Sequence, residues 1–155
     1  MILVSACLLG YPCRYDGLTT PSQELMERLR DEQVMAVCPE QLGGLPTPRP
    51  PADIMGPDGS AVLKGQAKVV DRTDTDRTDA FLHGARCTLA LAELVQATAV
   101  YLKNRSPSCA VQHFVDKKGV PRGMGVTAAM LTRAGFKVIE VTAASGSGQL
   151  AEKNI

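Results

Sequence analysis

The sequence contains no tryptophan, and phenylalanine and tyrosine contribute only three residues each. With so few aromatic rings, a hydrophobic core has to be built from aliphatic side chains, and 45% of the 155 residues are apolar. That length and composition predict a single domain with a core of its own. No apolar stretch approaches the roughly 20 residues that a membrane-spanning helix needs. We therefore expect no association with a membrane.

The chain also lacks an excess of charge of one sign. Its 17 basic and 16 acidic residues leave a formal net charge of +1. Nucleic-acid-binding domains usually carry a basic patch or stripe, so we expect no nucleic-acid partner. Residues 1–5, Met-Ile-Leu-Val-Ser, have neither the basic segment nor the cleavage pattern of a secretory signal peptide. This predicts a cytoplasmic protein.

Five cysteines are present. In a reducing compartment few cysteines are expected to pair as disulfides, and an odd number also argues against a disulfide framework. Cysteines that gather in such a chain more often bind metal or take part in chemistry.

Strand-like and helix-like segments alternate along the chain. Apolar runs typical of buried parallel strands occupy residues 2–9, 34–37, 99–102 and 136–141. Helical spacing of apolar residues predicts helices that begin near residue 21 and that span residues 80–96 and 124–133. This alternation predicts an α/β fold, a single-domain, three-layer Rossmann-like or flavodoxin-like open parallel sheet with helices on both faces.

The remaining segments are less regular. Glycine and proline are dense in residues 41–59, which predicts an ordered but irregular loop, and residues 62–70 favour a small hairpin or edge element. We expect the domain to occupy residues 1–142. The Gly/Ser-rich residues 143–155 are expected to form a flexible C-terminal tail.

Three cysteines follow three of the predicted strands. Cys7 and Cys38 end the first and second strands, and Cys109 follows the third by a few residues. Open parallel sheets bind ligands beyond the carboxyl ends of their strands, so these side chains are expected to meet at one edge. Cys13 is one loop beyond Cys7 and can reach the same place. Cys87 stands in an alanine-rich helix and is interpreted as structural.

Three or four thiolates suit either zinc or an iron–sulfur cluster. Structural zinc sites usually draw on closely spaced cysteine pairs, and this sequence has no C-x2-4-C pair. His113 is a weak candidate for a further ligand, and His83 is expected at the surface. Widely separated ligands favour a larger cofactor, a [4Fe–4S] cluster.

Several motifs, in this order, resemble the thiouracil desulfidase family over about residues 2–141. They are Ser5-Ala6-Cys7-Leu8-Leu9-Gly10, Cys13-Arg14-Tyr15-Asp16-Gly17, Cys38-Pro39-Glu40, Gly43-Gly44-Leu45-Pro46-Thr47-Pro48-Arg49-Pro50, Leu102-Lys103, Ser106-Pro107-Ser108-Cys109 and Gly123-Met124-Gly125-Val126-Thr127-Ala128-Ala129. The sequence departs from the family pattern at Ala110, where glycine is usual, and at Asp53, where glutamate is common.

The resemblance implies a [4Fe–4S] cluster held by three cysteines, for which we select Cys7, Cys38 and Cys109. It also implies non-redox removal of sulfur from a thiolated base such as 2-thiouracil. A fourth iron with an open position would bind the soft thiocarbonyl sulfur, and water would then replace that sulfur and release sulfide.

Six further side chains are candidates for this chemistry. A catalytic role is predicted for Glu40 as a general acid or base, for Ser106 as a hydrogen-bonding group, and for Cys13 as a free thiolate. The predicted substrate-binding residues are Arg49, Ser108 and Lys103. In addition, Gly123-x-Gly125 ahead of a helix offers backbone donors for an anion.

Two other functions remain open. If Cys13 is a fourth ligand, the site is closed, and the protein is a cluster- or zinc-bearing sulfur-transfer or sensor protein without hydrolase activity. Sulfur insertion into a tRNA would need a basic surface, which the net charge of +1 disfavours. The expected partner is therefore a small thiolated base, with the sulfide acceptor undetermined and the protein a monomer or homodimer.

Overall fold

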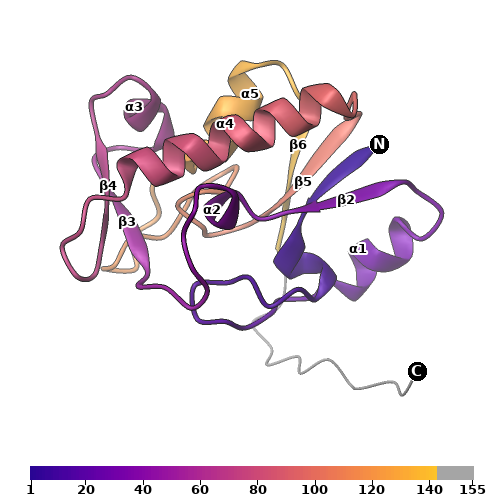
Figure 1. The fold of residues 1–155 in the computed structure, drawn as a ribbon, viewed down its shortest axis with the longest axis horizontal. Coiled ribbons are helices and arrows are strands. Elements are labelled where there is room, and N and C mark those ends of the chain that lie inside the picture. Colours follow the sequence, from indigo (N-terminus) through magenta and orange to yellow (C-terminus); the bar gives the residue numbers. More distant parts are fainter. Residues whose placement is uncertain (143–155) are drawn as a thin grey trace.

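A computed structural model describes residues 1–142, so the expected tail over residues 143–155 lies outside it. Four parallel strands form the main sheet in the order β2-β1-β5-β6. They are β1 (Ile2–Ser5), β2 (Val34–Val37), β5 (Ala99–Lys103) and β6 (Val138–Val141) (Figure 1). The chain crosses from the β2 side of β1 to its β5 side, which creates a switch in strand order between β1 and β5.

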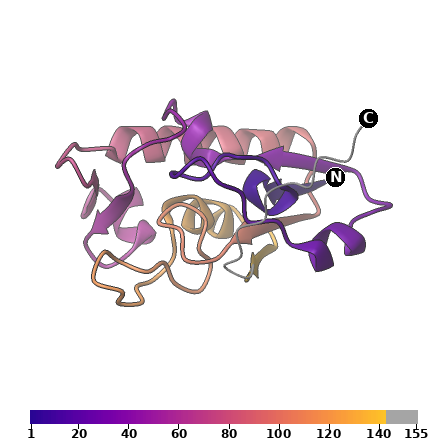
Figure 2. The same cartoon turned by 90° about the horizontal axis from the view of Figure 1, so that it is seen from below.

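Helices cover both faces of this sheet, as expected from the sequence (Figure 2). Side chains alternate between the faces along a strand. Ile2 and Val4 share a buried cluster with Leu25 of α1 (Gln23–Arg28). The intervening Leu3 belongs to a second cluster, which includes Ala92 of α4 (Thr78–Leu94) and Leu131 of α5 (Val126–Arg133). The three-layer α/β prediction is confirmed.

A smaller lobe stands beside the main sheet. Strands β3 (Ala52–Met55) and β4 (Lys68–Asp71) pair antiparallel, and α3 (Gly59–Leu63) connects them. The lobe shares a third buried cluster with one end of α4 and with the start of α5, and that cluster includes Val62, Val69, Phe81, Phe114 and Val126. The lobe therefore packs on the same α4–α5 layer that covers the main sheet.

The prediction of an irregular loop over residues 41–59 is wrong in part. That segment contains the end of α2 (Pro39–Leu42), all of β3 and the start of α3. Residues 62–70, expected to form a hairpin or edge element, are the end of α3 followed by β4. The prolines are concentrated in residues 46–51, directly before β3. Their density made the whole segment resemble a loop and concealed the strand. Within residues 1–142, no helix combines the length and the apolar composition that crossing a bilayer requires.

The first apolar run also differs from its expected form. The apolar run over residues 2–9 predicts one strand, but β1 ends at Ser5 and a single 3-10 turn, η1 (Ala6–Leu9), follows. Gly10 closes that turn with a φ of 92°, a left-handed conformation that glycine adopts without strain. The turn places Cys7 beyond the edge of the sheet instead of within the strand.

Helix α2 packs against α4 with their backbones in contact. A Cβ atom on Gly84 of α4 would lie 1.9 Å from the Pro39 carbonyl oxygen, and one on Gly43 would lie 2.1 Å from the Ala80 carbonyl oxygen. Only glycine fits at these two points, so they fix the position of α2 and of Cys38, which directly precedes it.

Gly84→Ala is therefore expected to destabilise the protein, by about 1–3 kcal/mol, as overpacked substitutions do, and to push α2 away from α4. Urea unfolding measures this change. Ala90→Ser, on the exposed side of the same helix, is the matched control and should stay within about 0.5 kcal/mol. Equal stability of Gly84→Ala and the control would contradict the close contact.

Candidate functional site

A cavity of about 790 Å³ opens at the carboxyl ends of β1, β2 and β5. Four of the five cysteines line it: Cys7, Cys13, Cys38 and Cys109. This confirms that the strand order brings them together at one edge of the sheet. The cavity is large enough for a bulky group and a small substrate together.

Each thiol arrives from a different element. Cys7 lies in η1, directly after β1, and Cys38 is the residue between β2 and α2. Cys109 follows β5 in a turn, and Cys13 stands in the loop after η1. Cys7, Cys13 and Cys109 are each at most 7% exposed. The site is thus assembled from three regions that are far apart in the sequence, around residues 7–13, 38 and 109.

Cys13 lies among the other thiols. The Cys38 thiol donates to the Cys13 carbonyl oxygen at 3.7 Å. The Cys38 contact lowers the pKa of Cys13, but the Cys7 contact and burial outweigh it and raise that pKa to about 11. The contact with Cys13, together with burial, raises the pKa of Cys38, and burial raises that of Cys109 to about 12. In the metal-free chain these groups are therefore neutral thiols, and a bound cation would be needed to hold them as thiolates.

The remaining cysteine and the two histidines stand apart from this cavity. Cys87 is half-buried on α4, where its sulfur lies 3.6 Å from Nε2 of His83. Among the described residues, neither histidine lines the cavity, nor does Cys87. His113 is thus not brought to the thiols.

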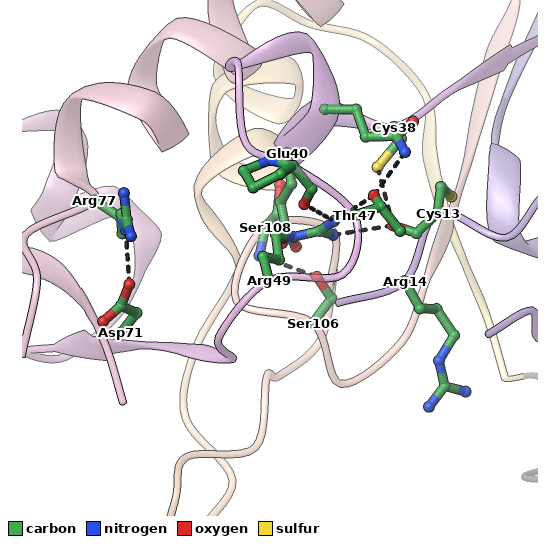
Figure 3. A network of polar contacts seen from close by, with 12 residues as sticks. Cys13, Arg14, Cys38, Glu40, Thr47, Arg49, Asp71, Arg77, Ser106 and Ser108 are labelled. Atoms are coloured by element: carbon green, nitrogen blue, oxygen red, sulfur yellow. Dashed lines mark hydrogen bonds and ion pairs between the residues drawn. The ribbon is translucent and has the colours of Figure 1, made fainter. Parts of the chain in front are cut away.

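Glu40 and Arg49 form an ion pair at the wall of the cavity. Nε of Arg49 donates to Oε2 of Glu40 at 2.6 Å (Figure 3). Glu40 lies in the first turn of α2, two residues after Cys38. Its charge raises the pKa of both Cys38 and Cys109, although less than burial does. The carboxylate therefore stands close to the thiol cluster.

Ser106 and Ser108 occupy different environments. The Ser106 hydroxyl oxygen accepts from the backbone N–H groups of Ser108 and Cys109, each at 3.1 Å. It lines the cavity, and no acceptor among residues 1–142 takes its own proton. Ser108 is 1% exposed, pairs with the Thr127 hydroxyl at 2.9 Å and does not line the cavity.

The backbone donors expected near Gly123-x-Gly125 are occupied. The N–H groups of Gly125, Val126 and Thr127 donate to carbonyl oxygens of the turn that carries Cys109. A Cβ atom on Gly125 would lie 2.5 Å from that turn. The expectation of a free anion site is wrong, because these donors instead fix the Cys109 turn against α5.

Lys103 ends β5 at the cavity. Burial lowers its pKa, while the neighbouring Cys7 and Cys109 oppose that shift. Its Nζ donates to the Asn104 carbonyl oxygen at 3.1 Å. Arg14 and Arg105 also line the cavity and act on Lys103 electrostatically. Positive charge therefore borders the thiols.

Ser5 is a site residue that the sequence reasoning missed. It is 2% exposed, lines the cavity and accepts from the Lys103 backbone N–H at 3.1 Å. Its hydroxyl hydrogen-bonds to Cys109 and lowers the pKa of that thiol, against the larger effect of burial. The sequence feature that could have identified Ser5 is its position as a polar residue inside the apolar run of residues 2–9.

The far wall of the cavity was also missed. It comes from the β3–β4 lobe and the loop over residues 115–119. Asp53 of β3 links the lobe to this loop, because its Oδ2 accepts from the Lys117 backbone N–H at 2.9 Å. No pattern in the sequence indicates this wall, because the glycine and proline density of residues 41–59 predicts an irregular loop.

Glu140 of β6 holds the segment after Cys109. Its Oε2 accepts from the backbone N–H groups of Val111 and Gln112 at 2.8 and 2.9 Å. We expect Glu140→Ala to lower the free energy of unfolding by about 1–2 kcal/mol, since two donors lose a charged acceptor. Glu140→Gln should cost less than half of that. Urea unfolding compares them, and an unchanged midpoint in Glu140→Ala would refute this role.

Known proteins resemble this chain over most of its length. A family model described as 2-thiouracil desulfurase matches residues 2–142. The uncharacterized protein YbbK of Bacillus subtilis (strain 168) is 44% identical over 144 residues, which cover 90% of this chain and 94% of YbbK. Among solved structures, the [4Fe–4S]-dependent thiouracil desulfidase TudS is 38% identical and superimposes with a TM-score of 0.77, over 90% of this chain and 89% of that one.

Proposed function

The chain belongs to the 2-thiouracil desulfurase family, and we propose that it removes sulfur from a thiolated pyrimidine base by a [4Fe–4S]-dependent, non-redox reaction. The observation that carries this proposal is the meeting of Cys7, Cys38 and Cys109 in one cavity, at the switch in strand order. The similarity to TudS, a [4Fe–4S]-dependent thiouracil desulfidase, supports it.

The residues present fit an iron–sulfur cluster. The donors are soft thiols, which iron–sulfur clusters use as ligands, and they line a cavity with room for such a group. Within residues 1–142, no three His, Cys, Asp or Glu side chains lie close enough to hold a single metal ion. We propose Cys7, Cys38 and Cys109 as the ligands.

A [4Fe–4S] cluster on three thiolates would supply a fourth iron without a protein ligand, a soft Lewis acid that polarises a C=S bond. The overall reaction exchanges the C=S bond for a C=O bond. The oxygen comes from water and the sulfur leaves as sulfide, so no electrons enter or leave. The protein has to bind the base, place one water and move its protons.

Glu40 is the proposed general base. It stands beside the thiols, and Arg49 engages only its Oε2 among the described residues, which leaves Oε1 for a water molecule. Ser106 is proposed to donate its hydroxyl proton to that water or to the substrate, since its oxygen is already held by two backbone N–H groups. Together the two side chains would orient and deprotonate the attacking water.

The other predicted roles stay proposals. The sequence predicts substrate contacts by Lys103, Arg49 and Ser108 and a catalytic role for Cys13 as a free thiolate. Arg49 and Ser108 are buried and engaged with other protein groups. Lys103, at the edge of the thiol cluster, would in addition offset the negative charge that collects there.

Sulfide release tests the proposal. The protein would be purified without oxygen, loaded with iron and sulfide, freed of excess sulfide and incubated with 2-thiouracil. We expect uracil and sulfide in equal amounts from the loaded protein and neither from the iron-free protein. A fully loaded protein that releases no sulfide would overturn the reaction. The same loading with zinc tests the closed, non-enzymatic site, which predicts stable zinc binding through all four cavity cysteines.

A further inference from the structure

We propose that Arg49 is a positioning residue that holds the Glu40 carboxylate and the Cys13 backbone in one rigid frame beside the thiol cluster. This inference rests on the proposed function, because it assigns how that reaction's base is oriented. It differs from the sequence-based expectation, in which Arg49 contacts the substrate.

The guanidinium of Arg49 reaches three segments of the chain (Figure 3). Nε donates to Oε2 of Glu40 at 2.6 Å, and one terminal nitrogen donates to the Cys13 carbonyl oxygen at 3.0 Å. The other terminal nitrogen donates to the Pro46 carbonyl oxygen at 3.2 Å and to the Thr47 hydroxyl at 3.1 Å. All three nitrogen atoms are therefore engaged.

These contacts connect the segments that carry the cavity cysteines. Arg49 joins the Cys13 backbone to the Glu40 carboxylate, and Glu40 follows Cys38 by two residues in the sequence. Arg49 therefore ties the acid–base group to the backbone segment of a second cavity cysteine.

Arg49 and Glu40 differ in how much of each side chain is exposed, and this difference indicates different roles. The Arg49 side chain is 5% exposed, and the Glu40 side chain is 16% exposed. A side chain with its donors engaged and its surface covered has little left to offer a substrate, whereas the carboxylate keeps an open edge toward the cavity. Only arginine combines a planar fork with donors in three directions, so lysine would not reproduce the frame.

Kinetics of Arg49→Lys and Arg49→Gln test the proposal, in loaded protein with a measured iron content. Both variants should bind as much iron as the unmodified protein, keep KM within about threefold and lose roughly 10- to 100-fold in kcat, the size of effect that a small misplacement of a catalytic group produces. Arg77→Lys is the matched control. Arg77 forms a comparable 2.7 Å pair with Asp71, which lies apart from Cys13 and Cys38 in Figure 3, and its variant should keep full kcat.

A double variant distinguishes positioning from substrate contact. If Arg49 acts through Glu40, then Glu40→Gln with Arg49→Gln should be no slower than Glu40→Gln alone. A raised KM with unchanged kcat, losses that multiply, or loss of iron in Arg49→Lys would each overturn the proposal.

A crystal structure of loaded Arg49→Lys gives a readout that does not depend on activity. The Glu40 carboxylate should be displaced from its place beside Cys38, and an unmoved carboxylate would overturn the positioning role. If the unmodified protein with full iron releases no sulfide, the proposed function fails, and this structure still decides the role of Arg49.

Discussion

Replacing Cys7, Cys38 or Cys109 by alanine is expected to abolish iron binding and sulfide release together. Each supplies one of three proposed thiolate ligands to the same cavity. Loss of one leaves too few soft donors to hold a cluster that depends on three. Iron and acid-labile sulfide per chain, measured after identical anaerobic loading, should fall to near zero in all three variants.

Two other cysteines serve as matched controls for that series. Cys87→Ala removes a half-buried thiol outside the cavity and should retain the full iron content. Cys13→Ala should retain most of the iron, because we propose that Cys13 is not a ligand. If Cys13→Ala loses iron as completely as Cys7→Ala, the site has four ligands, and the account of an open iron fails.

The second large effect is expected for Glu40→Gln. Glutamine keeps the shape of the side chain and an oxygen that Arg49 can bond, but it cannot accept a proton from water. We expect kcat for sulfide release to fall by about 100- to 10,000-fold, the usual contribution of a general acid or base, with iron content unchanged. Steady-state sulfide assays on loaded protein measure this fall.

Glu93→Gln is the control, because Glu93 is an exposed carboxylate on α4, and its kcat should match that of the unmodified protein. A Glu40→Gln variant that retains kcat within about threefold would remove Glu40 from the chemistry. In that case the proton transfers would have to be reassigned to Ser106 or to solvent.

The location of the thiols could be predicted from the sequence, because residues that follow parallel strands lie at the same edge of the sheet. Cys38 directly follows a short apolar run and Cys109 follows another, and the carboxyl ends of parallel strands share one edge. The presence of helices on both faces of the sheet was likewise predicted, from the alternation of strands and helices along the chain. These features depend on chain topology, which apolar patterns report well.

The contacts that refine the site did not follow from the sequence. The role of Ser5 depends on the end of β1 at that residue, and an apolar run does not reveal whether it continues as strand or turns into a 3-10 helix. The burial of Arg49 depends on how residues 46–49 fold back onto α2. Such contacts join segments distant in sequence, and only the assembled structure defines them.

The most direct test of the central claim is an isotope experiment on the loaded protein. It would be incubated with 2-thiouracil in 18O-labelled water, without an electron donor, and the uracil analysed by mass spectrometry. The account predicts one labelled oxygen atom in each uracil formed and one sulfide released per uracil. Unlabelled uracil, or turnover that requires a reductant, would contradict hydrolytic, non-redox removal of sulfur.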